Sequence, residues 1–284
     1  MPKVLSEEQV DRFHREAFIA TIPILSADEV ARYRDHLEAF EAKFPEHRRK
    51  LKSKSHFLCP WVEDIARNDR ILNVYDDLIG PNILCYSVAF RIKEPDGKTF
   101  AGWHQDGAYN PIKPILAIGA LVLSECSVST GCLSVIPRSH KGGTLSHEDT
   151  GNPVSILSRG QYVTEDFDKS NAVDIELKPG EIGIFYSEII HGSRVNRGDD
   201  RRIMLLVEMM PTHVEARAHR DTSVLVRGID IFGNVDIDRS PEVEFGPDEL
   251  AAWQKATRKT GKNVFSDSPL PLTKVYGGTV SVNR

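Results

Sequence analysis

The chain has 284 residues, 40% hydrophobic and 27% charged, which is ordinary for a globular enzyme with a sizeable core. A net charge of −5 leaves no basic excess for binding nucleic acid without sequence preference. Four cysteines without a CxxC pair argue against a zinc ribbon or a thioredoxin-type site. No signal-peptide pattern and no apolar run near the roughly 20 residues of a membrane span are seen. We therefore expect a cytoplasmic protein with free thiols and no membrane partner.

The N-terminal part, about residues 1–80, is predicted to be helical. Ser6 with Gln9, and Ser26 with Glu29, have the spacing of capping boxes. Apolar residues then recur at intervals of three or four, at Val30, Tyr33, Leu37 and Phe40 and again at Ile71, Leu72, Tyr75, Leu78 and Ile79. The basic run His47–Lys54 is interpreted as a solvated helix end or loop.

Beyond Gly80 the pattern changes to short segments rich in β-formers and separated by Gly/Pro turns. The predicted strands are 83–92, 115–123, 133–136, 173–177, 182–186 and 203–209. A helix returns near 247–257. Helices followed by many short strands predict a mainly β fold, a sandwich or barrel with flanking helices. We expect one domain over 1–284, with a core at about 83–210 and a C-terminal extension at about 211–284.

The strongest chemical signal is Trp103-His104-Gln105-Asp106-Gly107. In a strand, residues i and i+2 point to one face, so His104 and Asp106 can present an imidazole and a carboxylate to one point. His191 is the best third ligand, and two histidines with one carboxylate leave three positions on iron open. The competing interpretation is a chance HxD whose histidine is a hydrogen-bonded core residue.

Arg202 follows His191 by eleven residues. A hairpin through 196–199 would place Arg202 on the neighbouring strand, near the metal, where its planar fork could bind a carboxylate. Two alternatives stay open. Arg202 could form a surface ion pair with Asp199 or Asp200, and a one-residue slip would put Arg201 in its place.

With these motifs in order, the chain resembles the phytanoyl-CoA dioxygenase (PhyH) family of iron(II)/2-oxoglutarate oxygenases. The matching segments are the opening helix 5–18, Trp103 to Gly107, Thr130 to His140 (TGCLSVIPRSH), Pro179-Gly180-Glu181, and His191-Gly192-Ser193 with Asn196 and Arg202. Departures from the family pattern are Ala17 and Arg138 for glycine, Thr130 for asparagine, and Ser124-Glu125 for an acidic pair. The segments 56–84 and 226–234 are most similar to the branch of specialised metabolism that includes halogenase-like members.

The resemblance implies a double-stranded β-helix (jelly-roll, cupin-like) core and the cofactors Fe(II), 2-oxoglutarate and O₂, with ascorbate stimulatory. It implies His104, Asp106 and His191 as metal ligands. It also implies that Arg202, assisted by Ser193, binds the distal carboxylate of 2-oxoglutarate, with Lys93 as a further candidate. His140 matches a family position too, but we interpret it as structural.

The implied reaction is hydroxylation of an unactivated C–H bond of a small molecule, with release of succinate and CO₂. Halogenases of the similar branch lack the carboxylate ligand, whereas this chain keeps Asp106. Desaturation, epoxidation, ring formation, a zinc hydrolase and a non-enzymatic binding module are the alternatives.

We expect the substrate pocket to be formed by the segment near His56, the loop 108–114 and the region 217–234. Its arginines suggest an anionic group on the substrate, and solvated arginines are an equally good interpretation. They are Arg217, Arg220 and Arg227.

Overall fold

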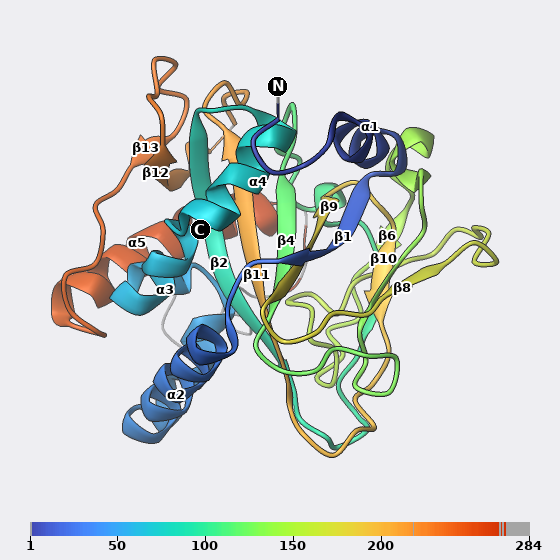
Figure 1. Ribbon diagram of the computed structural model, residues 1–284, viewed down its shortest axis with the longest axis horizontal. Coiled ribbons are helices and arrows are strands. Elements are labelled where there is room, and N and C mark those ends of the chain that lie inside the picture. The colour runs from blue at the N-terminus through green and yellow to red at the C-terminus, as the bar shows by residue number, and fades with distance from the viewer. Residues whose placement is uncertain (1, 218, 267, 269, 271–284) are drawn as a thin grey trace.

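The computed structural model describes residues 2–217, 219–266, 268 and 270, and Figure 1 shows their arrangement. A seven-stranded sheet has the order β1-β9-β4-β11-β2-β12-β13, and a four-stranded sheet has the order β3-β10-β5-β8. All neighbouring strands in them are antiparallel except β12 and β13. In Figure 1, α2, α3 and α5 lie on the left of the larger sheet, and β8 and β10 lie on its right. No helix of the described part is long and apolar enough to cross a membrane.

The helices are α1 Glu7–Glu16, α2 Ala27–Lys43, α3 Pro60–Ala66, α4 Asp69–Ile79 and α5 Pro247–Val264, with 3₁₀ turns η1 Pro45–Lys52, η2 Ser55–Phe57, η3 Asp106–Ala108 and η4 Ser139–Gly142. The strands are β1 Phe18–Pro23, β2 Ile83–Lys93, β3 Ala101–His104, β4 Ala117–Val122, β5 Leu133–Val135, β6 His147–Glu148, β7 Tyr162–Val163, β8 Val173–Ile175, β9 Glu181–Tyr186, β10 His191–Ser193, β11 Arg202–Pro211, β12 Thr222–Arg227 and β13 Asp236–Ile237.

The two sheets and their flanking helices confirm the predicted mainly β, jelly-roll fold. Both capping boxes are present, at Ser6 with Gln9 and at Ser26 with Glu29. The expected division of the chain differs in two places. β1 from the helical N-terminal part and β12 from the C-terminal extension both join the larger sheet, because β9 and β2 offer free edges to them. α5 is also longer than predicted and runs to Val264.

The alternation of side chains in β4 divides the core into two layers. Ala117 and Leu121 belong to the layer between the larger sheet and the helices, with residues of α2, α3, α4 and α5. Ile118, Ala120 and Val122 belong to the layer between the two sheets, with residues of β5 and β8. A strand apolar on both faces, as β4 is, fits a sheet that is covered on both sides.

The basic run 47–54 does not lie wholly in solvent as expected. Lys50 and Lys54 are buried, and the Lys54 ammonium donates to the carbonyls of Tyr86 at 2.6 Å and Thr222 at 3.0 Å. Burial lowers the pKa of Lys54. The run is therefore partly built into the protein, where carbonyls of two strands replace the water around its ammonium.

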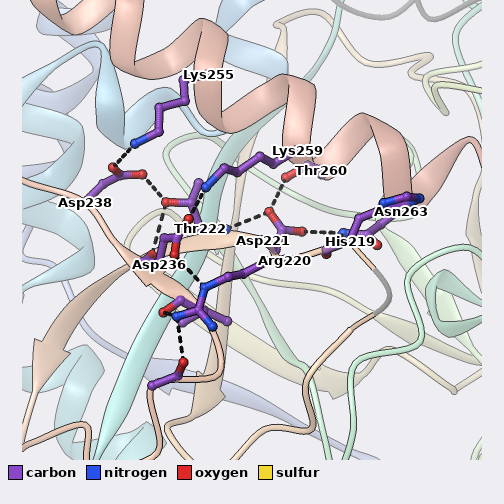
Figure 2. Close-up of polar contacts among 12 residues, drawn as sticks. His219, Arg220, Asp221, Thr222, Asp236, Asp238, Lys255, Lys259, Thr260 and Asn263 are labelled. Atoms are coloured by element: carbon purple, nitrogen blue, oxygen red, sulfur yellow. Dashed lines mark hydrogen bonds and ion pairs between the residues drawn. The ribbon is translucent and has the colours of Figure 1, made fainter. Parts of the chain in front are cut away.

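α5 is held on the edge of the larger sheet by carboxylates of the segment 221–238 (Figure 2). Asp221 accepts hydrogen bonds from Thr260 Oγ1 at 3.0 Å and Asn263 Nδ2 at 3.3 Å. Asp238 meets the ammonium of Lys255 at 3.2 Å, and Asp236 pairs with Lys259. Asp221 is 1% exposed, so its contacts are little screened by water.

Replacing Asp221 by alanine should therefore loosen α5. The change leaves Tyr86 Oη and Arg217 Nη1, which also bond to Asp221, without this acceptor. We expect the free energy of unfolding to fall by about 3 kcal/mol and amide exchange in 247–264 to accelerate.

The matched control is Asp248→Ala, an exposed aspartate in the first turn of the same helix. It should change the stability by less than about 1 kcal/mol. Equal effects of the two changes, measured by chemical denaturation and hydrogen exchange, would remove Asp221 as the anchor of α5.

Candidate metal centre

Two histidines face each other across neighbouring strands of the smaller sheet. His104 is the last residue of β3 and His191 the first of β10, and they are direct partners in the ladder. Asp106 lies in the 3₁₀ turn η3 rather than on the strand. The expectation that His104 and Asp106 share one strand face is therefore wrong in detail, because the chain turns after Gln105 and carries the carboxylate back toward both imidazoles.

The three side chains converge. Their ligand atoms lie within 4.8 Å of one another. His104 Nε2 is 3.3 Å from Asp106 Oδ1, and His191 Nε2 is 3.5 Å from Asp106 Oδ2. Each imidazole donates its Nδ1 proton to a carbonyl two residues earlier, Gly102 O at 2.8 Å and Ile189 O at 3.0 Å. These bonds leave both Nε2 lone pairs directed at the carboxylate, which is the tautomer that a metal ligand needs.

The electrostatics of the group agree with this use. Burial, then the neighbouring His104, lowers the pKa of His191 to about 4. Burial alone would raise the pKa of Asp106, but His191 and His104 together hold it well below its usual range. At neutral pH, His191 is thus neutral and Asp106 is charged, as binding of a divalent cation requires.

Gln105, the middle residue of the motif, fixes the turn. Its buried amide donates to Gly143 O at 3.0 Å and Glu188 O at 2.8 Å and accepts from Leu145 N at 2.9 Å. Its backbone N–H donates to His147 Nε2 at 3.0 Å. These partners lie far from Gln105 in the sequence, in β6 and in segments outside the strands, so local pattern could not predict them. They hold His104 and Asp106 in one relative orientation.

Arg202, Lys93 and Ser193 come together as a second cluster. Lys93 Nζ donates to Ser193 Oγ at 2.6 Å, and Arg202 donates to Gly131 O at 3.2 Å and Arg91 O at 3.1 Å. Both cations are buried. Within the described residues, neither meets a carboxylate, and Arg202 Nε has no hydrogen-bond partner. Burial, then the charge of Arg202, lowers the pKa of Lys93 to about 6.

The expected surface ion pair of Arg202 with Asp199 or Asp200 is not formed in the described protein. Arg201, not Arg202, forms ion pairs, with Glu41 at 2.6 Å and Glu94 at 2.8 Å. Asp200 pairs with Arg34 instead. The expected hairpin is wrong, however: β10 pairs with β3 and β5, and Arg202 begins β11 of the larger sheet. The chain crosses between the sheets here, so Arg202 approaches the site from the facing sheet.

A cavity of about 130 Å³ reaches Asp106. Its lining includes the predicted loop residues Tyr109 and Asn110, and Lys52 to Lys54 just before the predicted segment near His56. The described residues of the expected region 217–234 do not line it, and α5 provides Thr260 and Val264 instead.

Glu208 of β11 also lines this cavity, although it was not predicted as a site residue. Burial, opposed by Arg91, raises its pKa to about 7. The sequence feature that could have indicated Glu208 is a single acidic residue in an otherwise apolar stretch of β11. Glu208 is separated from Arg202 and Met204 by even numbers of residues, so it lies on the same strand face as they do.

The three arginines that suggested an anionic substrate have partners in the protein. Arg217 donates to Asn110 at 2.6 Å and pairs with Asp221. Arg220 pairs with Asp236 at 2.6 Å, and Arg227 with Asp69 at 2.7 Å. Their charges are used to hold the C-terminal segments together. His140, interpreted as structural, packs its ring edge-on against Tyr186.

Curated relatives cover part of the chain. A probable alpha-ketoglutarate-dependent hypophosphite dioxygenase of Stutzerimonas stutzeri is 27% identical over 174 residues, 59% of this chain and 60% of the relative. The peroxisomal phytanoyl-CoA dioxygenase of Bos taurus is 31% identical over 140 residues, 46% of this chain and 41% of the relative. The chain thus spans about half the length of the curated relatives it matches.

Solved structures share the fold. The non-heme monooxygenase ThoJ superimposes with a TM-score of 0.81 at 23% identity, over 91% of this chain and 98% of its own. CytC3 with Fe(II) and alpha-ketoglutarate gives 0.66 at 21% identity, over 87% and 98%. The family model for phytanoyl-CoA dioxygenase (PhyH) matches residues 1–204, a stretch that contains His104, Asp106, His191 and Arg202. The chain therefore belongs to the PhyH family.

Proposed function

We propose that the protein is an Fe(II)- and 2-oxoglutarate-dependent dioxygenase that hydroxylates an unactivated C–H bond of a small molecule. The observation that carries this proposal is the convergence of His104, Asp106 and His191, with both Nε2 atoms directed at one carboxylate. Three such ligands on one side of iron leave three positions for the cosubstrate and O₂. The printed names of the relatives, hypophosphite dioxygenase and phytanoyl-CoA dioxygenase, support the same class of chemistry.

Bound iron with 2-oxoglutarate and O₂ would supply the oxidising power, with release of succinate and CO₂. The chain's own part is to bind and orient. Arg202, with Lys93 and Ser193, would bind the distal carboxylate, since two buried cations there lack a carboxylate partner in the described protein. Ser193 lies two residues beyond His191 on β10, about 7 Å along the strand. That separation suits a short dicarboxylate that reaches from the metal to the cations.

Hydroxylation is preferred to halogenation because Asp106 occupies the position that a halide would need. Desaturation, epoxidation and ring formation use the same oxidant and differ in how the substrate is placed. A binding module without activity is disfavoured because the chain keeps all three metal ligands together with Arg202.

Replacing Asp106 by alanine should weaken Fe(II) binding by more than about 100-fold, since a charged ligand is lost. The unchanged protein, given Fe(II), 2-oxoglutarate and O₂ without substrate, should form succinate slowly, and the variant should form none. Iron affinity by calorimetry and succinate by chromatography are the measurements.

Two controls accompany this test. Asp96→Ala removes an exposed turn carboxylate outside the site and should leave iron binding unchanged. Zinc in place of iron should give no succinate, since zinc has no redox chemistry. Succinate formation by Asp106→Ala at the rate of the unchanged protein would refute the proposed metal centre.

Variants of the adjacent residues Arg202 and Arg201 give a matched test of 2-oxoglutarate binding. Removing one member of a buried charge pair costs about 2–5 kcal/mol. Arg202→Ala should therefore raise the KM for 2-oxoglutarate by well over tenfold. Arg201→Ala should lower stability by loss of its contacts with Glu41 and Glu94 and leave that KM within about twofold. The reverse result would make Arg201 the anchor.

A further inference from the structure

A second cavity, of about 330 Å³, adjoins the one that reaches Asp106. The two share Lys52, Arg91, Leu157 and Ser158 in their linings. The second, outer cavity continues to Arg49 and to the loop 151–158. A molecule with one end near Asp106 could therefore extend into the outer cavity past Lys52 and Arg91.

The outer cavity is lined by three cations, Arg49, Lys52 and Arg91, and by no carboxylate among the described residues. The side chains of Arg49 and Lys52 make no hydrogen bond or ion pair with any residue that the structure describes. Arg91 donates from Nη1 to the carbonyls of Lys52 at 2.8 Å and Phe90 at 3.2 Å. Arg91 Nε and Nη2 make no hydrogen bond to a described residue, so they can donate hydrogen bonds to a ligand.

The three charges are close enough to act on one another. Desolvation lowers the pKa of Lys52, and the charges of Arg91 and Arg49 lower it further. Elsewhere the protein pairs its arginines, as at Arg34 with Asp200 and Arg201 with Glu41. An anion between the three cations would relieve their repulsion.

The facing wall adds neutral donors. Ser155 and Ser158 of the loop 151–158 line the outer cavity. Ser155 Oγ accepts a hydrogen bond from Leu157 N at 3.3 Å, so its own proton is available to a ligand. Hydroxyl donors beside guanidinium and ammonium groups suit an oxyanion.

The placement of the acidic side chains gives the substrate an orientation. Asp106 and Glu208 line only the inner cavity, where Lys52, Lys54 and Arg91 also lie, whereas the outer cavity has three cations and no carboxylate among the described residues. An anion would be repelled from the inner end and attracted to the outer one. A substrate with one oxyanion group would thus present its other end to the metal side.

We propose that the primary substrate is a small organic oxyanion, a carboxylate or a phosphoryl compound, whose anionic group binds to Arg49, Lys52 and Arg91. The substrate class rests on the proposed function, whereas the anion subsite itself does not. This subsite is separate from the Arg202 cluster, since Arg202 lines neither cavity.

The test uses metal-free full-length protein and three probes that share one butyl chain: pentanoate, butylphosphonate and butylammonium. Ligand-observed NMR titration gives their affinities at low salt and at about 0.5 M KCl. The Debye length is about 10 Å at 0.1 M salt and shorter at the higher concentration, so charge attraction is then more strongly screened. We expect the anions to bind and butylammonium not to bind, with weaker anion binding at high salt. The tighter of the two anions identifies the group that the subsite prefers.

Three variants locate the probe. Arg49→Met with Lys52→Met should weaken anion binding by about tenfold or more. Lys98→Met, an exposed cation that lines neither cavity, should leave it unchanged. Arg202→Ala removes the proposed carboxylate anchor of the cosubstrate site, so anion binding that persists in this variant and depends on Arg49 and Lys52 belongs to the outer cavity. No anion binding by the unchanged protein, or loss of binding only with Arg202→Ala, would overturn the subsite.

The two proposals fail in different ways. Anion binding that depends on Arg49 and Lys52, in a protein that forms no succinate with iron, would refute the proposed function and keep the subsite. Succinate formation stimulated equally by neutral and anionic compounds, and insensitive to the double variant, would refute the substrate class and keep the function.

Discussion

The site depends on one cross-strand pair, His104 opposite His191. Partners in an antiparallel ladder have Cβ atoms about 5 Å apart, so pairing β3 with β10 brings two imidazoles together before any metal binds. The adjacent turn then adds Asp106, and Gln105 fixes that turn through four hydrogen bonds to residues distant in sequence, one of them in β6. A shift of one residue in this ladder would send one histidine to the opposite face.

The larger sheet supplies the rest of the site through the alternation of β11. Ile203, Leu205 and Val207 face the helices, so Arg202, Met204 and Glu208 face the space between the sheets. Arg201 lies one residue before the strand and binds Glu41 of α2. The same register thus sends Arg201 to the helical layer and Arg202 to the interior. That is why two adjacent arginines have such different surroundings.

Much of this was predictable from local pattern. The strands β2, β4, β5, β8, β9 and β11, the capping boxes and the residues of the triad have signals in spacing and composition, and the motif order indicated the family. The course of the chain between elements was not predictable. The turn at Gln105 depends on partners distant in sequence, such as Glu188 and Gly143. The crossing from β10 to β11 depends on the strands with which each of them pairs. The pairing of Arg217, Arg220 and Arg227 with carboxylates also needs the fold, since sequence cannot tell a free cation from a paired one.

The distribution of paired and unpaired cations connects stability with binding. Arginines that hold segments together meet carboxylates, as Arg201 and Arg217 do. Lys93 and Arg202 are instead buried side by side without one, and burial lowers the pKa of both. Keeping Arg202 charged away from water destabilises the ligand-free protein, and the pKa of about 6 favours the neutral form of Lys93 at neutral pH. A dianion would pair with Arg202 and favour the charged form of Lys93. Because it binds only the folded state, it must stabilise that state as its concentration rises. The same residues would thereby serve recognition of the cosubstrate and completion of the core between the two sheets.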